Sequence, residues 1–499
     1  MNETDLSIRL QWYKTKLENC SDVIFNTFLT KSQHRCALIY IQGMFDSVTL
    51  QKNLLALLDE YISLHEDTFV QDIIENNQLF ISENNVYCDL EKGLDAIMNA
   101  HGLLIIDGNP YIIEIPYTDF EKRSIEEAAN ESVIRGSREA FVESIQTNLT
   151  LIRRRIRNPK LKTEQMIIGK QSKTIVVITY IEGICSEKLI KEMKRRLSYI
   201  EIDGVLGSSY LQECIQDTPY SPFPQVQYTE RPDTVCASLL EGRISVLVDN
   251  TPIALLAPVT LPMLLQAAED YYQSFIFASF IRIVRLLFFG ISLLLPSLYI
   301  AVTTFHPEMM PFDLLISVSA SREIVPFPAL MEAFIMEMAF EALREASIRI
   351  PKSIGQAVSI IGALIIGTAA VQAGIVSAAM VIIVSLTGIA SFIIPNFDLG
   401  LSFRLLRFPI MLLAGFFGIF GITCGLLVIY IHMINLSSFG VPYLSPFTPM
   451  NNGDYEDTLI RTPWWRMKYR PKNFSTHNAM RQSNKSRDWR YNQQGENAE

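Results

Sequence analysis

The side chains with the clearest chemical potential lie in residues 329–347 (ALMEAFIMEMAFEALREAS), a segment predicted to be helical. Four ionisable residues share one face of that helix because they are spaced i, i+4, i+7 and i+8: Glu337, Glu341, Arg344 and Glu345. Apolar residues supply much of the opposite side: Leu330, Phe334, Met338 and Leu343. The pattern predicts an amphipathic helix with an acidic stripe.

This stripe has two interpretations, and the residues leave both open. In the first, the helix lies at a membrane interface, with its charges in water and its apolar side in lipid. In the second, the stripe lines a water-filled path, where ionisable residues at membrane depth are usually found. Repeated around an oligomer, Glu337 and Glu341 would then form acidic rings that favour cations.

The next predicted helix, Ser353–Gln372, carries small residues at every fourth position: Gly355, Ser359, Ala363 and Gly367. Small side chains let helix backbones approach closely in lipid, so this face is expected to contact another helix. Thr368 and Gln372 place polar groups at the far end of the helix. A pore-lining face that includes Ser359, Thr368 and Gln372 is the alternative interpretation.

A short proline motif, Pro326, Phe327 and Pro328, comes directly before the acidic helix. The two prolines fix backbone dihedrals and remove two amide donors. Irregular backbone is excluded from lipid, so the motif predicts a hinge or re-entrant segment buried against protein. A rigid surface loop is the equally open alternative.

An enzyme is not expected from this sequence. It lacks G-x-G-x-x-G, G-x-x-x-x-G-K-[ST] and H-E-x-x-H, and Gly169-Lys170 has no upstream glycine to form a phosphate loop. The seven cysteines show no metal-type spacing and the six histidines are dispersed. We therefore predict no catalytic residues, no metal and no cofactor.

The composition indicates a membrane protein. The chain has 499 residues and a net charge of −9, with 49% hydrophobic and only 19% charged residues, and its mean hydropathy is +0.20. These values exclude disorder for most of the chain and argue against a nucleic-acid partner. From Ser353 to Phe397 about 45 residues carry no charge, roughly 68 Å of helix, or about two crossings of a ~30 Å hydrocarbon core.

The distribution of charge predicts four regions. Residues 1–130 and 131–274 resemble a soluble α/β domain in two subdomains, the second preceded by a linking helix over 132–157. Residues 275–440 form an all-α membrane domain, and residues 441–499 a basic, Trp-containing, partly disordered tail that favours anionic lipid headgroups. Membrane spans are expected at about 284–305, 354–373, 375–395 and 408–435, with 329–348 as the amphipathic or re-entrant helix.

An internal duplication is predicted in the soluble half. A strand ending in glycine leads into a helical pattern at 37–59 and again at 175–197. Each copy continues, about 59 residues after its glycine, into a hairpin-like run, at 102–116 and 242–258. Two related α/β subdomains are therefore expected.

The expected topology places both ends of the chain in the cytoplasm. The N-terminus lacks a signal-peptide pattern, and the tail is basic, which together require an even number of crossings. Four spans satisfy this but leave Arg404 and Arg407 outside, against the positive-inside rule. The alternative lets the acidic helix span, which moves those arginines inside and the tail outside.

The sequence resembles the A subunits of GerA-type spore germination receptors over nearly its whole length. The resemblance is strongest in five segments: PYSPFPQVQYTERPDTV (219–235), EGRISVLVDNTP (241–252), REIVPFPALMEA (322–333), EALREASIRIP (341–351) and GQAVSIIGALIIGTAAVQAGIVS (355–377). Several long segments in the expected order are more specific than any single motif. The tail after about residue 475 is outside the family pattern.

The resemblance implies a subunit of a nutrient germinant receptor in the spore inner membrane, with a cytoplasmic N-terminal domain. It implies two partners, a polytopic B subunit and a lipoprotein C subunit, and a homo-oligomer that acts as a ligand-gated cation channel. Two alternatives remain: a non-conducting membrane scaffold, and an A-subunit-like partner of the dipicolinic-acid release machinery.

Overall fold

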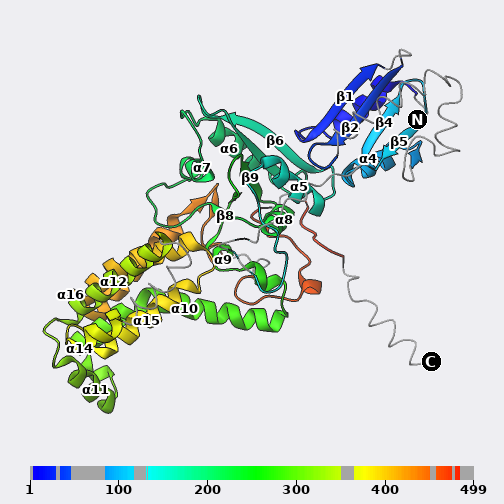
Figure 1. The fold of residues 1–499 in the computed structure, drawn as a ribbon. Coiled ribbons are helices and arrows are strands. Elements are labelled where there is room, and N and C mark those ends of the chain that lie inside the picture. Colours follow the sequence, from blue (N-terminus) through cyan, green and yellow to red (C-terminus); the bar gives the residue numbers. More distant parts are fainter. Residues whose placement is uncertain are drawn as a thin grey trace, which may run out of the picture. The chain divides into compact units, whose positions relative to one another are not determined.

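The computed structural model describes residues 4–29, 34–45, 85–116, 128, 131, 133–349, 365–449, 457–474 and 478–483 (Figure 1). The chain divides into two compact units. The α/β unit contains residues 1–217, 226–258 and 465–499, and the helical unit contains residues 218–225 and 259–464. This division differs from the expected boundaries at two places, the loop 218–225 and the tail after residue 464.

The α/β unit contains two five-stranded antiparallel sheets with the same strand order. The first sheet is ordered β1-β2-β4-β5-β3 and the second β6-β7-β9-β10-β8. The strands of the first sheet are β1 (Val23–Leu29), β2 (Arg35–Ile41), β3 (Val86–Tyr87), β4 (Gly102–Ile106) and β5 (Ile112–Ile115). Those of the second are β6 (Leu161–Ile168), β7 (Thr174–Ile181), β8 (Gln227–Thr229), β9 (Ile244–Val248) and β10 (Ala254–Ala257).

The matching order confirms the predicted duplication. In each sheet the hairpins expected at 102–116 and 242–258 are formed, by β4–β5 and β9–β10. The helical pattern expected at 47–59 in the first copy lies outside the described residues, whereas its counterpart forms α6 (Glu187–Ser198). The predicted fold class, an α/β N-terminal region followed by a helical region, is confirmed.

Helices cover both sheets because each presents an apolar face. α1 (Leu6–Lys16) and α4 (Leu90–Met98) share one core with the first sheet. α5 (Ile145–Arg155) and α8 (Pro232–Glu241) share another with the second, which also carries α7 (Ser208–Ile215). α5 starts at Ile145 rather than 132, because Ser144 caps it by accepting a hydrogen bond from the Thr147 amide.

A buried ion pair joins the two subdomains. Both oxygens of the Asp22 carboxylate accept hydrogen bonds from Arg153, at 2.7 and 2.9 Å, and Asp22 also accepts one from Thr163 at 2.6 Å. Burial opposes ionisation of Asp22, but the guanidinium and these hydrogen bonds hold its pKa below the usual value. Removing either partner would leave an unpaired buried charge.

The tail residues 465–483 fold as part of the α/β unit where they are described. Arg470 donates to the Leu240 carbonyl at 2.7 Å, at the C-terminal end of α8. The backbone pairs across the tail, since the Arg470 and Arg481 amides donate to the Ala479 and Lys468 carbonyls, both at 2.8 Å. The described part of the tail therefore folds within the α/β unit, and the predicted partial disorder of the tail stays a prediction.

The helical unit is built mainly from α10 (Phe275–Phe305), α12 (Ala329–Arg349), α15 (Ala378–Phe392) and α16 (Phe397–Asn435). Shorter elements connect them: α9 (Leu261–Leu264), η1 (Ala268–Tyr271), η2 (Pro307–Met309), α11 (Phe312–Arg322), η3 (Ile365–Ala369), α14 (Ala370–Gln372), β11 (Ser437–Ser438), β12 (Val441–Pro442) and η5 (Trp464–Arg466). α12 and α15 run in parallel, because Glu332 lies near Ser377 and Phe340 packs on Gly388.

Helix α16 folds back on itself at Gly418, whose φ of 62° and ψ of −141° are not helical. A Cβ on Gly421 would lie 2.1 Å from the Leu413 carbonyl oxygen. In a straight helix these residues would be about 12 Å apart, so the chain must reverse. α16 is thus a helical hairpin with arms 397–417 and 419–435, which differs from the single span expected over 408–435.

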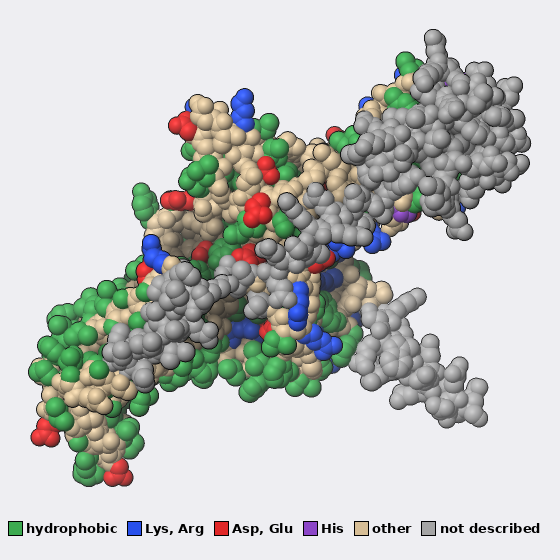
Figure 2. All heavy atoms as spheres, viewed as in Figure 1, with side chains coloured by type: hydrophobic (Ala, Val, Ile, Leu, Met, Phe, Trp, Pro, Cys, Tyr) green, Lys and Arg blue, Asp and Glu red, His purple; other side chains and the backbone are tan. Residues whose placement is uncertain are grey.

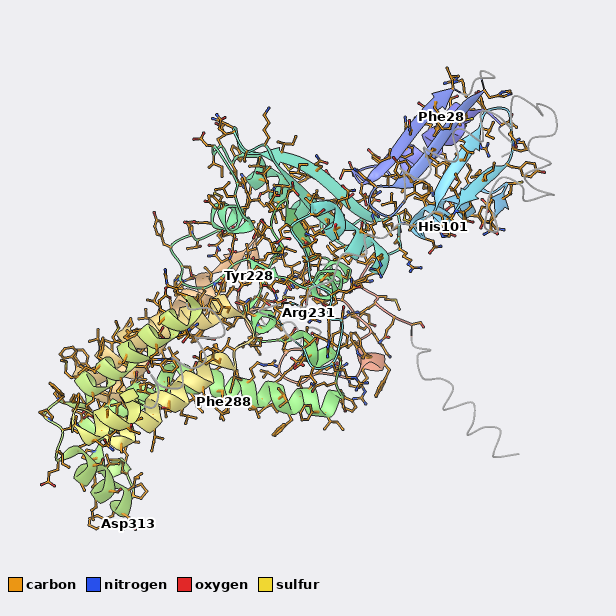
Figure 3. All side chains as sticks on the ribbon, in the orientation of Figure 1. Phe28, His101, Tyr228, Arg231, Phe288 and Asp313 are labelled. Carbon is orange, nitrogen blue, oxygen red and sulfur yellow. The ribbon has the colours of Figure 1, made fainter. Side chains whose placement is uncertain are left out.

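Three parts of the chain meet at one end of the helical unit, which we call the basal end: residues 218–225, residues 259–274, and the described residues 436–449 and 457–464. The Ser438 hydroxyl donates to the Gln225 carbonyl at 2.6 Å and accepts from the Val259 amide at 3.1 Å. The opposite end contains Phe305 and His306, which surround Gly418, and α11 with Asp313 at its tip (Figure 3). The chain thus enters and leaves this unit at the same end.

The face of the helical unit seen in Figure 2 is largely apolar. By length and composition α10, and α16 taken over its full 39 residues, are apolar enough to cross a membrane, and 33% of the most apolar 18-residue stretch of each is buried. α15 is a shorter apolar helix. Large hydrophobic side chains such as Ile382, Leu405 and Phe420 are 63–71% exposed, as expected for helices that face lipid.

Candidate functional site

The first residue of the predicted acidic stripe, Glu337, is fully buried in the helical unit. Its Oε2 accepts a hydrogen bond from Nη1 of Arg407 on α16 at 2.5 Å, and the two side chains are 0% and 1% exposed. Nε of Arg407 donates to the Ser292 carbonyl on α10 at 2.8 Å. One buried ion pair thus connects α10, α12 and the first arm of α16.

The other acidic residues of α12 also have arginine partners. Glu332 lies 3.3 Å from Nε of Arg322 on α11. Arg344 donates to Glu341 at 3.1 Å, and Arg349 donates to Glu345 at 2.6 Å. Every carboxylate of α12 is therefore neutralised within the chain, and the acidic stripe predicted from spacing is a row of ion pairs.

The row changes from buried to exposed along the helix. Glu332 and Glu337 are 0% exposed, whereas Glu345 is 59% exposed and its partner Arg349 78%. Met338, predicted on the apolar side, is 57% exposed. The first half of α12 therefore turns its charges toward the neighbouring helices, its last turns expose them, and part of its apolar side faces outward.

Several polar atoms in this row have no hydrogen-bond partner among the described residues. They include Oε1 of Glu337, Nη2 of Arg407 and Nη1 of Arg404, all buried. An incompletely satisfied buried pair is held less firmly than a fully bonded one.

The small-residue helix is described only at its end. Gly355, Ser359 and Ala363 lie outside the described residues. Gly367 packs toward Val381, since a Cβ there would lie 3.7 Å from that side chain, and Thr368 and Gln372 are exposed. The packing role of the small residues and the pore-lining role of Ser359, Thr368 and Gln372 both stay predictions.

The proline motif Pro326–Phe327–Pro328 connects α11 to α12. Glu332, four residues after Pro328, contacts two other segments. Its Oε2 accepts a hydrogen bond from the Ser377 amide at 3.0 Å, and its Oε1 pairs with Arg322. Phe327 is 38% exposed. The motif is thus bracketed by a buried carboxylate that links three segments, and its role as a hinge or re-entrant segment stays a prediction.

A loop from the Pro-rich segment, residues 218–225, packs into the basal end of the helices. Phe223 is 2% exposed and its ring lies 5.8 Å from Phe403 and 6.2 Å from Tyr443. Ser221 and His432 share a hydrogen bond at 2.8 Å. In sequence this loop lies between α7 and β8, and in the structure it packs within the helical unit on the α16 hairpin.

Sequence reasoning missed the pairing of Arg407 and the role of His432. In the sequence, Arg407 stands out only as a charge on the wrong side of the membrane. The available signal is that Arg407 conflicts with the positive-inside rule while Glu337 lies in an apolar region without an evident partner. Together these two features indicate an internal ion pair.

Comparison with known proteins extends over nearly the whole chain. Residues 11–473 match the family model described as "Bacillus/Clostridium GerA spore germination protein". The chain is 46% identical to the uncharacterized membrane protein YfkQ of Bacillus subtilis (strain 168), covering 93% of this chain and 90% of that protein. It is 43% identical to spore germination protein KA of the same organism, covering 95% of this chain and 87% of that protein.

A solved structure is also similar. The N-terminal domain of the A subunit of the Bacillus megaterium spore germinant receptor GerK3 is 33% identical, with a TM-score of 0.40, and the match covers 51% of this chain and 95% of that one. The family match over residues 11–473, together with the relatives' identity and coverage, defines the assignment: this chain belongs to the GerA family of spore germination proteins.

Proposed function

We propose that this chain is the A subunit of a nutrient germinant receptor and that it helps to trigger spore germination. The observation that carries the proposal is the family match over residues 11–473. It is supported by the relatives named spore germination protein KA and spore germination protein A1, of which the match covers 87% and 94%. The partners are then a polytopic B subunit and a lipoprotein C subunit, as in the family.

The proposed location is the spore inner membrane, with the helical unit in the bilayer and the α/β unit in the cytoplasm. The apolar exterior and the long apolar helices α10 and α16 support this placement. The tail folds within the α/β unit and the chain enters and leaves the helical unit at the basal end, which supports an even number of crossings. Arg407 then lies inside the helical unit as a paired charge.

The proposed activity is cation conduction by a homo-oligomer, with α12 and the helix before Gln372 nearest the path. α12 is the candidate because its ionisable side chains reach the interior of an apolar unit. Since Glu337 and Glu341 are paired with Arg407 and Arg344, a conducting state requires these pairs to rearrange. The resting structure is accordingly the closed state, and ligand binding in the complex would shift the equilibrium.

Conductance in liposomes tests this activity. The purified chain with its B and C partners would be reconstituted, and wild type compared with Glu337→Gln and Glu341→Gln. We expect altered conductance or cation selectivity in both. Glu345→Gln is the matched control, because that carboxylate is on the same helix but exposed. Unchanged conductance and selectivity in the Glu337 and Glu341 variants would reject the acidic ring.

A non-conducting scaffold is the second candidate. It is favoured by one observation, that all four carboxylates of α12 are neutralised by arginines within the chain. The same liposomes separate the two functions, since a scaffold would give no ligand-dependent current in any variant while still binding its partner subunits.

A further inference from the structure

In the first turns of α10 the charged side chains are buried and the large apolar side chains are exposed, which is the opposite of a surface helix on a soluble protein. Ala278, Arg282 and Arg285 are buried, whereas Ile276, Phe277, Phe280 and Ile283 are 52–69% exposed. The two sets lie on different faces because each is spaced at three or four residues. A helix that turns its arginines inward and its aromatic and aliphatic residues outward is adapted to a non-aqueous neighbour.

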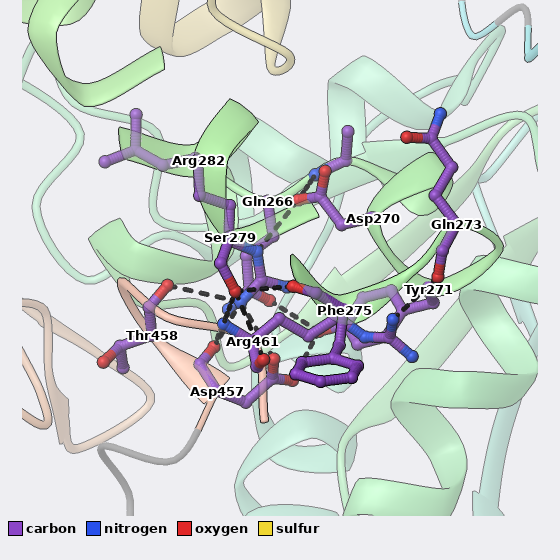
Figure 4. A network of polar contacts seen from close by, with 12 residues as sticks. Gln266, Asp270, Tyr271, Gln273, Phe275, Ser279, Arg282, Asp457, Thr458 and Arg461 are labelled. Carbon is purple, nitrogen blue, oxygen red and sulfur yellow. Dashed lines mark hydrogen bonds and ion pairs between the residues drawn. The ribbon is translucent and has the colours of Figure 1, made fainter. Parts of the chain in front are cut away.

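The inward arginines pair with two acidic side chains, Asp270 and Asp457; Figure 4 shows both acids with Arg282. Arg285 donates to both oxygens of Asp270, at 2.9 and 3.1 Å. Arg282 donates to Asp270 at 3.1 Å and to Asp457 at 2.9 Å. The exposed apolar face is therefore held in place by ion pairs on the opposite face, of which those with Asp270 are buried and that with Asp457 is partly exposed.

Residues 457–464 form a strap along these turns. The Arg461 amide donates to the Ser279 hydroxyl at 3.1 Å, and Arg461 Nη1 donates to the Gln273 carbonyl at 2.9 Å. The strap presents Leu459, Ile460 and Trp464, which are 43%, 60% and 44% exposed. It thus adds an aromatic and two aliphatic side chains beside the apolar face of α10.

The length of α10 places this face at headgroup depth. The helix Phe275–Phe305 is roughly 46 Å long, which exceeds the ~30 Å hydrocarbon core but matches a bilayer of ~40–45 Å including its headgroups at ordinary tilt. Residues 286–305 are uncharged and suffice for the core. The preceding turns then lie where tryptophan and tyrosine side chains concentrate in membrane proteins.

We propose that the first turns of α10 and the strap 457–464 form a lipid anchor at the headgroup–acyl boundary of the leaflet next to the basal end. Its occupant is the lipid surface, because the exposed face continues the apolar exterior of α10 (Figure 2). The inference rests on the membrane placement proposed above and is independent of conduction. The ion pairs of Asp270 and Asp457 with the arginines of α10 fix the anchor to the basal end.

Tryptophan quenching in the full chain tests the anchor. In a background with Trp12, Trp464, Trp465 and Trp489 replaced by phenylalanine, single tryptophans are restored at 464 or introduced by Phe280→Trp. The protein is reconstituted in vesicles containing lipids brominated near the glycerol or in mid-chain. We expect the tryptophan fluorescence at both positions to be quenched more strongly by lipids brominated near the glycerol than by lipids brominated in mid-chain. Iodide dissolved in the water should quench it only weakly.

Two control variants make each outcome decisive. Tyr220→Trp reports water, because Tyr220 is 99% exposed at the basal end, and Leu298→Trp reports the hydrocarbon core, because it is 39% exposed within the uncharged part of α10. Lipid quenching at Leu298→Trp with iodide quenching at Phe280→Trp would overturn the anchor while leaving membrane placement intact. Protection of Phe280→Trp from both quenchers would also overturn it, in favour of a protein partner. Absence of lipid quenching at Leu298→Trp would reject the membrane placement itself, and the anchor with it.

Discussion

Glu337 and Arg407 face each other across the helical unit, with Oε2 and Nη1 2.5 Å apart and neither side chain more than 1% exposed. Arg407 also donates to the Ser292 carbonyl, so the pair fixes three helices at once. Water does not reach either charge in this arrangement, and each depends on the other for compensation. The pair is therefore the point at which α12 and α16 can least easily separate.

Removing one member of this pair should destabilise the helical unit more than removing both. Arg407→Met leaves the Glu337 carboxylate buried without a cation, and we expect a loss of about 3–5 kcal/mol. The double variant Glu337→Met, Arg407→Met should recover most of that loss, because apolar side chains of similar volume fill the site. Thermal unfolding of the detergent-solubilised protein measures the difference, and a double variant as unstable as Arg407→Met would contradict it.

The hairpin at Gly418 should depend on glycine at two positions. Gly418 has a positive φ, and a Cβ added there would lie 3.2 Å from both His306 and Phe305, while a Cβ on Gly421 would overlap the Leu413 carbonyl. Gly418→Ala and Gly421→Ala should each lower stability by about 1–3 kcal/mol. Gly290→Ala on α10 is the control, since nothing lies within 4 Å of its Cβ position. Equal stability of all three variants would argue against the reversal.

The sequence predicted the α/β repeat but not the α16 hairpin, and the reason is physical. Strand alternation and turn dipeptides such as Asp107-Gly108 are local signals, so β4–β5 could be located without tertiary information. The reversal at Gly418 lies inside an apolar run with no polar residue to mark a turn, and hydropathy alone gives one span over 408–435. Likewise Glu337 was located by spacing, but Arg407 is 70 residues away and only the fold brings them together.

The loop at Phe223 should stabilise the helical unit at its basal end. Phe223→Ala removes a buried ring that contacts Phe403, His432 and Tyr443, and we expect a loss of about 3–5 kcal/mol. Tyr220→Ala, in the same loop but 99% exposed, should change stability by less than about 0.5 kcal/mol. Unfolding of both variants, and the germination response of spores that carry them, would be measured. A normal response from a folded Phe223→Ala protein would show that the loop does not transmit the signal.

Glu131 should make the stability of the α/β unit depend on pH. Its Oε2 accepts from Thr229 at 2.6 Å and from the Glu230 amide at 3.3 Å, yet burial raises the pKa of Glu131 from 4.5 to about 7. Because the folded pKa is above the unfolded one, the stabilising contribution is complete below about pH 4.5 and is lost as pH rises to about 7. The loss is at most about 3 kcal/mol.

Glu131→Gln should remove this dependence, because the amide keeps an oxygen acceptor for Thr229 and does not ionise. Denaturant unfolding at pH 5 and pH 8 should then show that wild type loses more stability between the two values than the variant does. Glu143→Gln is the matched control, since Glu143 is exposed and its substitution should leave the wild-type profile unchanged. If wild type and Glu131→Gln have parallel profiles, Glu131 ionises normally in the folded protein, and the contacts around Thr229 stabilise its charged form enough to offset burial.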